Sequence, residues 1–207
     1  MAPSSVVYRV GDGLYINLTN RCSCACVFCL RHNGPSMGNA QSLWLEEEPD
    51  FSQVIDQLQA EYDAMAPQVP TEVVFCGYGE PTEAFDLLKQ VAAYVHETWG
   101  LPVRINTNGQ GRLINGRDIV PEFAGLIDRV SVSLNAPTAP RYQELSQSEF
   151  GQEAFEEVLD FTRAVAGVVD EVTMTTVGTL LTEEEERACD EICRGLGVRY
   201  RIRTYEG

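Results

Sequence analysis

The chain has 207 residues, of which 44% are hydrophobic and 22% are charged. This composition excludes a mainly disordered chain, and the length indicates a single domain over residues 1–207 with a substantial core. Thirty-one acidic residues against 15 lysines and arginines give a net charge of −16. Nucleic acid is therefore not expected as a partner, because proteins that bind it carry a basic surface.

The apolar runs of the sequence are short. None approaches the roughly 18 residues needed to cross a bilayer, and residues 1–20 lack the basic-then-apolar order of a signal peptide. We therefore expect a soluble, cytoplasmic protein with no membrane partner.

Six short segments rich in Val, Ile, Leu or Tyr are predicted to be strands. They are residues 13–18, 72–76, 103–106, 129–134, 171–177 and 198–202. Helices are predicted between them, over residues 51–65, 82–100, 118–127, 153–166 and 182–197. Thr82 and Thr182 are the expected N-caps of two of these helices, and Thr182 with Glu185 forms a capping-box pattern.

Strands that alternate with helices indicate parallel βαβ units. Six strands can form an open doubly wound sheet or an incomplete barrel, whereas a closed eight-stranded barrel needs about 250 residues. In both architectures ligands bind at the carboxyl ends of the strands. The longest connection, residues 20–49, follows the first predicted strand, so we expect it to be a functional loop.

This loop holds four of the seven cysteines of the chain, which are Cys22, Cys24, Cys26, Cys29, Cys76, Cys189 and Cys193. An odd count without an export signal argues against a disulfide framework. Four cysteines within eight residues indicate metal or iron–sulfur ligation. Three thiolates on a four-iron cluster would leave one iron open to a small molecule. A zinc site that uses all four cysteines, or His32, is the alternative.

The spacing Cys22-x3-Cys26-x2-Cys29, with Phe28 before the last cysteine, resembles the signature of the radical S-adenosylmethionine (radical SAM) enzymes. In that superfamily the motif follows the first strand, as it does here. Cys24 lies inside this triad and adds a fourth thiol.

Three later segments strengthen the resemblance. Residues 75–81, Phe-Cys-Gly-Tyr-Gly-Glu-Pro, are similar to the Gly-Gly-Glu-Pro motif, with Tyr78 in place of the first glycine. Residues 106–109, Asn-Thr-Asn-Gly, and residues 130–135, Val-Ser-Val-Ser-Leu-Asn, resemble the ends of the next two strands. Within the superfamily, residues 14–22, 28–31 and 75–82 are most similar to the short TatD-associated radical SAM proteins.

The resemblance implies an α/β fold, an incomplete parallel (β/α)6 barrel or partial TIM barrel. It implies an enzyme that uses a [4Fe-4S] cluster to cleave S-adenosylmethionine reductively. The resulting 5′-deoxyadenosyl radical would abstract hydrogen from an unidentified small molecule or peptide. An electron donor such as flavodoxin or ferredoxin would be a partner, and a TatD-type hydrolase would be functionally linked.

Residue roles follow from the matching motifs. Cys22, Cys26 and Cys29 would hold the cluster. The S-adenosylmethionine site would comprise Phe28 near the adenine, Gly79 and Glu80 at the methionine amino group, Asn106 facing the ligand, Ser133 at the methionine carboxylate and Asn135 at the ribose or carboxylate. Physically, glycine lets a backbone approach a ligand closely, and a carboxylate pairs with an ammonium group.

Arginines alternate along the last predicted strand. The period of two puts Arg199, Arg201 and Arg203 on one side. They can form the charged face of an edge strand. Alternatively, Arg203, together with Arg201, lies at the open mouth of the barrel and binds a carboxylate or phosphate group of the substrate.

Other functions fit parts of this pattern. Within the superfamily they are a glycyl-radical-enzyme activase and a ring-contracting enzyme of deazapurine synthesis. The RNA methylases of the superfamily are longer and more basic. Outside it, the cysteines would serve a non-enzymatic zinc or Fe–S binding module. Cys189 and Cys193 lie four residues apart on a predicted helix, where buried small side chains are expected.

Overall fold

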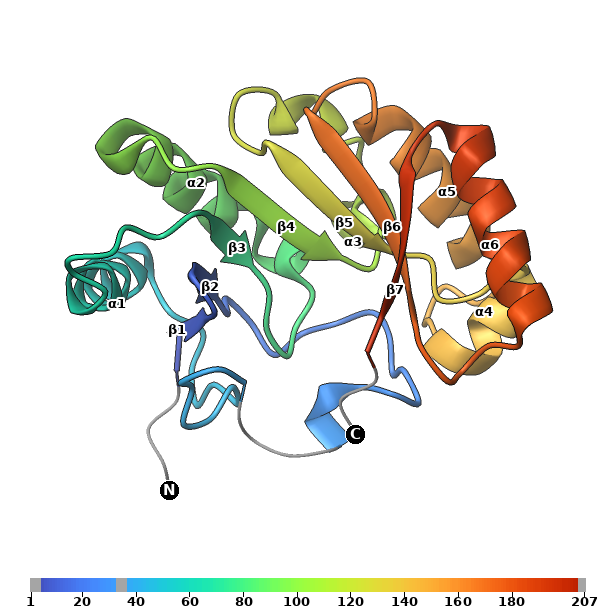
Figure 1. The fold of residues 1–207 in the computed structure, drawn as a ribbon, viewed down its shortest axis with the longest axis horizontal. Helices are drawn as coiled ribbons and strands as arrows, with labels where there is room; N and C mark the ends of the chain where they lie inside the picture. The colour runs from blue at the N-terminus through green and yellow to red at the C-terminus, as the bar shows by residue number, and fades with distance from the viewer. Residues whose placement is uncertain (1–4, 33–36, 205–207) are drawn as a thin grey trace.

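A curved sheet of seven strands organises the molecule in this computed structural model, which describes residues 5–32 and 37–204 (Figure 1). In order across the sheet, the strands are β1 (Val7–Val10), β2 (Gly13–Ile16), β3 (Val73–Phe75), β4 (Val103–Thr107), β5 (Arg129–Ser133), β6 (Glu171–Val177) and β7 (Arg199–Arg203). β1 pairs antiparallel with β2, and every later pair is parallel. β1 and β7 are the two edges, so the sheet does not close among the described residues.

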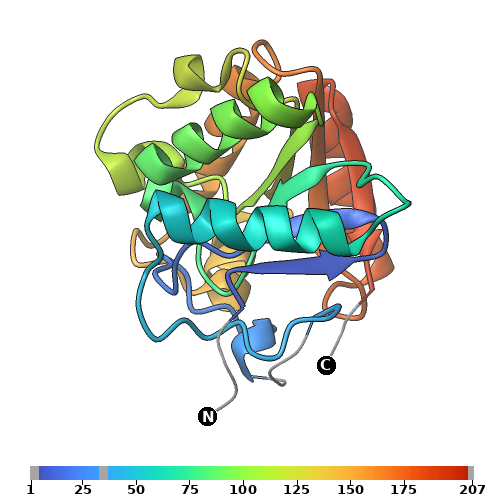
Figure 2. The same ribbon diagram turned by 90° about the vertical axis from the view of Figure 1, so that its left-hand side faces the viewer.

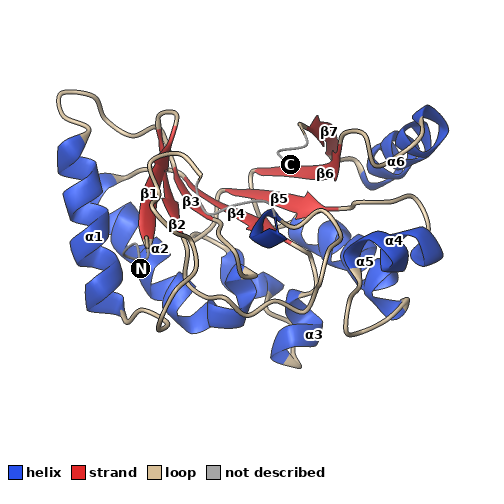
Figure 3. Cartoon of the chain, turned by 90° about the horizontal axis from the view of Figure 1, so that it is seen from below, coloured by secondary structure: helices blue, strands red, loops and turns tan. Residues whose placement is uncertain are grey.

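The helices cover the convex side of this sheet (Figure 3). They are α1 (Phe51–Ala64), α2 (Phe85–Trp99), α3 (Gly111–Asn115), α4 (Ala139–Ser146), α5 (Glu153–Val165) and α6 (Glu183–Leu196), with 3-10 helices η1 (Leu30–His32), η2 (Pro81–Ala84) and η3 (Val120–Phe123). Figure 2 shows α1 lying along the β1–β2 hairpin, with which it is in contact. A doubly wound fold reverses its strand order and has helices on both faces. The sequential order found here is that of a barrel, so the predicted partial barrel is confirmed.

β5 and β6 each separate an apolar face from a more polar one. Val130 and Val132 of β5, like Val172 and Met174 of β6, belong to the core beneath the helices. The alternate residues, such as Ser131, line cavities on the concave face. A closed barrel fills its interior with packed branched apolar side chains. The polar concave face here instead leaves space for ligands.

The six predicted strands and four of the five predicted helices are confirmed. The helix expected over residues 118–127 is wrong, because only η3 forms there. Pro121 lacks an amide donor, and Gly125 has a φ of +72°, which ends the helical path. The hairpin strand β1 and the short helices α3 and α4 were not predicted.

The two predicted N-caps differ in outcome. Thr182 caps α6, and Glu185 completes the capping box. Thr82 is not a cap: it lies within η2, and its hydroxyl donates to Glu80, whose side chain caps η2 instead. As for membrane insertion, no helix in residues 5–32 and 37–204 has the length and hydropathy of a bilayer span.

Candidate functional site

A cavity of about 540 Å³ lies at the carboxyl ends of the parallel strands, on the concave face. It brings together all ten residues that the sequence singles out. These are Cys22, Cys26, Cys29, Phe28, Gly79, Glu80, Asn106, Ser133, Asn135 and Arg203. They come from five separate segments of the chain, so the fold assembles one site from motifs that are distant in sequence. Their individual roles stay predictions.

The cysteine loop is seated on the turn that follows β3. The Glu80 amide donates to the Arg21 carbonyl oxygen at 2.8 Å. A Cβ on Gly79 would lie 2.1 Å from the Thr19 carbonyl oxygen, and one on Gly77 would lie 2.0 Å from Asn17 Oδ1. Both glycines are therefore needed for the close packing of this loop against the turn, rather than for the approach of a ligand alone.

Glu80 is held by the protein itself. Its carboxylate accepts hydrogen bonds from the Thr82 amide (3.1 Å) and hydroxyl (2.8 Å), from Thr107 Oγ1 (2.7 Å) and from the Asn108 amide (2.7 Å). Burial raises the pKa of Glu80, and these hydrogen bonds oppose the rise. These hydrogen bonds join the ends of β3 and β4 through Glu80, which also lines the cavity. Its contact with the methionine ammonium stays a prediction.

Cys24, the fourth thiol of the loop, has a hydrogen-bond partner in Gln110, a fully buried residue. Gln110 Nε2 donates to Cys24 Sγ (3.1 Å) and to Tyr142 Oη (2.8 Å). Its Oε1 accepts from the hydroxyls of Ser23 and Ser148, both at 2.9 Å. Cys24 thus has an amide donor at 3.1 Å, whereas the amide donor of Cys22, Asn108 Nδ2, lies at 4.0 Å. The ligand set of Cys22, Cys26 and Cys29 stays a prediction.

The rest of the cysteine loop rests on the end of α4. The Ala25 amide donates to the Ser146 carbonyl oxygen (3.1 Å), and the Val27 amide donates to that of Leu145 (3.0 Å). Asn108 Nδ2 donates to Ser23 Oγ at 3.0 Å. The loop is therefore fixed from β3, β4 and α4 at once, and its cysteines are fixed with it.

Asn135 lines the cavity and carries a buried acceptor that is unsatisfied. It is 4% exposed and adopts a left-handed φ of +60°, a conformation that asparagine tolerates better than most residues. Its Nδ2 donates to Ser146 Oγ at 3.1 Å, but its buried Oδ1 has no hydrogen-bond partner among the described residues. Leaving a buried acceptor unpaired is unfavourable. A ligand hydroxyl would satisfy it.

Sequence reasoning did not single out several residues of this cavity. They are Tyr15, Arg104, Asn108 and Thr175, together with Gln110 behind the cavity wall. Arg104 orients Asn106 by donating to its Oδ1 at 2.6 Å. The signal that could have found Arg104 and Thr175 is the alternation of polar and apolar residues along β4 and β6.

Residues 16–193 match the sequence model of the family described as the Radical SAM superfamily. The chain belongs to the radical SAM superfamily. As the resemblance implied, it is an enzyme of a family whose cofactors are a [4Fe-4S] cluster and S-adenosylmethionine. The match covers most of the chain, including the cysteine loop and the turn after β3.

Solved radical SAM structures share this fold. SuiB of Streptococcus suis, bound to S-adenosylmethionine, is 18% identical with a TM-score of 0.65, over 93% of this chain and 40% of SuiB. A radical SAM methyltransferase from Sphaerobacter thermophilus is 16% identical with a TM-score of 0.66, over 97% of this chain and 69% of that one. TsrM from Kitasatospora setae, with cobalamin and a [4Fe-4S] cluster bound, is 12% identical with a TM-score of 0.54, over 89% of this chain and 32% of TsrM.

This radical SAM chain therefore spans about two fifths of the length of SuiB. At these identities the likeness establishes the fold alone. No curated protein matches the sequence.

The side chains present suit the two cofactors. The three predicted ligand thiols line the cavity without a disulfide, as do Cys24 and Cys76, beside Asn135 with its unpaired oxygen and Ser133. Within the part of the chain that the structure describes, no group of three or more His, Cys, Asp or Glu surrounds a single metal position. Cluster ligands need not do so, because each thiolate binds a different iron.

Proposed function

We propose that this radical SAM enzyme cleaves S-adenosylmethionine reductively in the 540 Å³ cavity and removes hydrogen from an organic substrate bound beside it. The observation that carries the proposal is the convergence of all ten motif residues on this one cavity. When bound there, the [4Fe-4S] cluster and S-adenosylmethionine would supply the radical chemistry. The protein would position both cofactors and restrict the entry of water.

Cys22, Cys26 and Cys29 would each bind one iron, which leaves the fourth iron open to a ligand. The hydrogen bonds that fix the cysteine loop would keep the three sulfur atoms in place without the cluster. Cys24 would stay hydrogen-bonded to Gln110 and outside the ligand set.

The remaining cavity residues would hold S-adenosylmethionine. Ser133 would donate to the methionine carboxylate, and the free Asn135 Oδ1 would accept from a ribose hydroxyl. Phe28 would pack near the adenine, and the backbone around Gly79 together with Glu80 would hold the methionine amino group. Asn106, oriented by Arg104, would face the ligand.

We propose Arg203, at the rim of the cavity, as a contact to the substrate. A flavodoxin or ferredoxin would deliver the electron. The sequence segments that resemble the TatD-associated radical SAM proteins, residues 14–22, 28–31 and 75–82, support membership of that subgroup and a functional link to a TatD-type hydrolase.

The test is anaerobic reconstitution followed by reduction with dithionite in the presence of S-adenosylmethionine. We expect about four irons per chain and release of 5′-deoxyadenosine. Cys26→Ala should lose both the cluster and the product. Cys24→Ala, the matched control from the same loop, should keep both.

Two results would overturn this proposal. Zinc without iron after anaerobic preparation would indicate a closed four-ligand module instead. A full cluster in Cys26→Ala would show that the ligand set is wrong.

A further inference from the structure

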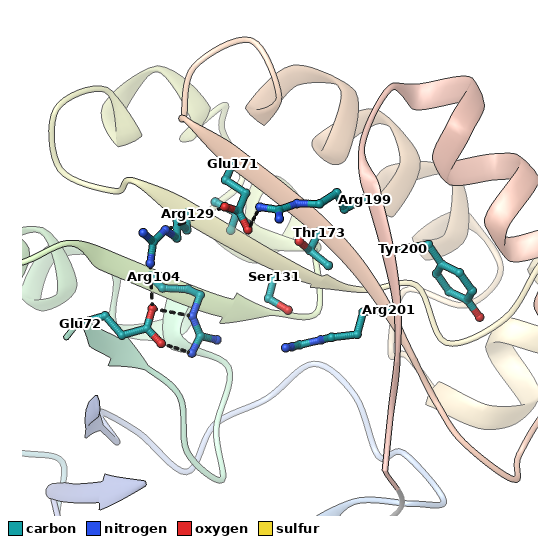
Figure 4. Close-up of a pocket in the computed structure, with 10 residues that line it drawn as sticks. Glu72, Arg104, Arg129, Ser131, Glu171, Thr173, Arg199, Tyr200 and Arg201 are labelled. Atoms are coloured by element: carbon teal, nitrogen blue, oxygen red, sulfur yellow. Dashed lines mark hydrogen bonds and ion pairs between the residues drawn. The ribbon is translucent and has the colours of Figure 1, made fainter. Parts of the chain in front are cut away.

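A second cavity, of about 400 Å³, opens on the concave face nearer the amino ends of the strands (Figure 4). It borders the first cavity, because Arg104, Ser131 and Arg201 line both. The two cavities thus form one trough along the inner side of the sheet. Volumes of this size suit a small molecule or one group of a larger one.

Charged side chains dominate this second cavity, hereafter the lower cavity, with four arginines and two glutamates. Five of the six form an alternating row of ion pairs across the strand starts. Glu72 pairs with Arg104 at 2.6 Å and with Arg129 at 3.4 Å. Glu171 pairs with Arg129 at 4.0 Å and also with Arg199. In this row every charge has an opposite neighbour.

Among the described residues that line this cavity, Arg201 is the one charged residue that does not belong to the row of ion pairs. It has no hydrogen bond or ion pair with any residue in 5–32 or 37–204. Its side chain extends from β7 across the concave face, whereas Tyr200 points to the other side of the strand (Figure 4). The guanidinium therefore presents an uncompensated positive charge to the trough, in a chain whose net charge is −16.

The surroundings of Arg201 offer further donors for an anion. The hydroxyls of Ser131 on β5 and Thr173 on β6 line the same cavity from neighbouring strands. Arg104 is already occupied, because it donates to Glu72, Asn106 and Tyr15. Arg201 is thus the guanidinium of this cavity that can give its full hydrogen-bonding fork to a ligand.

We propose that Arg201 binds a carboxylate or phosphate group of the substrate and holds it in the lower cavity, below the S-adenosylmethionine site. The inference rests on the proposed function, because it names the class of molecule on which that reaction acts. The substrate is an anion, anchored by its charged end toward the strand starts. Its reacting carbon then lies nearer the strand ends.

The test uses cluster-loaded protein that contains isotope-labelled arginine, with S-adenosylmethionine present. Side-chain nuclear magnetic resonance follows titration with inorganic phosphate in one arm and with succinate in the other. We expect a saturable shift of the Arg201 resonance, identified by its absence in Arg201→Gln, in at least one arm. The arm that binds tighter tells phosphate from carboxylate substrates. Followed through the side-chain resonance of Arg104, which lines the same cavity and is retained in the variant, binding should weaken about tenfold in Arg201→Gln through loss of one charge-assisted contact.

Arg187→Gln is the control with the same change in charge. Arg187 lies on the outer face of α6 with a side chain that is 70% exposed, and its loss should leave the affinity within about twofold, as expected of an exposed and screened charge. Equal weakening in both variants, or no saturable shift in either arm, overturns the inference. If the wild type binds the probe but releases no 5′-deoxyadenosine, the proposed reaction fails and the anion site stands. If it releases 5′-deoxyadenosine but binds neither probe, only the anion site fails.

Discussion

Gly79 illustrates how one residue couples two motifs of this site. The loop that carries the cysteines and the turn after β3 approach so closely that a methyl group at residue 79 meets two backbone carbonyl oxygens, those of Thr19 and Arg21. Backbone atoms cannot move aside as a flexible side chain can. The glycine thus sets the distance between the predicted cluster ligands and the predicted S-adenosylmethionine site.

We predict that Gly79→Ala destabilises the protein by about 2 kcal/mol or more, since overpacking against fixed atoms costs that much. It should also lower the iron content after reconstitution. The measurements are urea unfolding and iron analysis. Gly195→Ala is the control, because a Cβ there meets nothing within 4 Å. In the last turn of α6 it should stabilise by about 0.5 kcal/mol. Similar effects of the two changes would contradict this account of Gly79.

The roles of single residues could be predicted where neighbouring residues in the sequence define them. The cysteine spacing and the glycines of residues 75–81 are visible in the sequence because a few neighbouring residues define them. Gln110 was not predictable, since its partner Cys24 lies 86 residues away. The hydrogen bonds of Glu80 were not predictable for the same reason, since its donors Thr107 and Asn108 come from another strand end.

At the scale of elements, the row of ion pairs binds the amino ends of the parallel strands together. The side chains of Glu72 and Arg104 are only 18% and 17% exposed, so their pair is largely buried. Burial alone would raise the pKa of Glu72, but Arg104 and Arg129 outweigh it and hold this pKa below its usual value. Glu72 therefore stabilises the folded state above its unfolded-state pKa, and this contribution is lost as the pH falls through its folded-state pKa.

We predict that Glu72→Gln destabilises the fold by about 3 kcal/mol near pH 7, because it leaves Arg104 buried without a counter-charge. The difference from the wild type should shrink below about pH 4, where wild-type Glu72 takes up its proton as well. Denaturant unfolding at several pH values measures this. The exposed Glu97, changed to glutamine, should shift stability by less than about 0.5 kcal/mol at every pH. A deficit in Glu72→Gln that does not vary with pH would exclude the ion-pair explanation.

Elements with a clear period were predictable, and short ones were not. The parallel strands and α1, α2, α5 and α6 each carry enough apolar residues to show their spacing. The helices α3 and α4, with five and eight residues, are too short for that. β1 had a weaker signal, the turn Gly11-Asp12 between two apolar segments, which is typical of a hairpin.

At the scale of the whole molecule, a single domain over residues 1–207 predicts that the chain unfolds as one cooperative unit. One hydrophobic cluster of buried residues extends from Val6 to Cys193 and includes side chains from both ends of the sheet. We expect calorimetry of the cluster-loaded protein to show a single transition in which the calorimetric and van't Hoff enthalpies agree. Two separable transitions would show that the two halves of the sheet unfold independently.

Among the described residues β1 and β7 do not pair with each other, and a loop residue, Asn39, hydrogen-bonds the outer edge of β1, so the concave trough has no strand on this side. A substrate fixed to a bulky carrier can then insert one group sideways while the carrier stays outside. A substrate group that occupies this open side also keeps solvent away from the reacting atoms. The fraction of S-adenosylmethionine that is cleaved without product formation should therefore rise as the substrate fits this open side less well. A low fraction of uncoupled cleavage would then identify the native substrate.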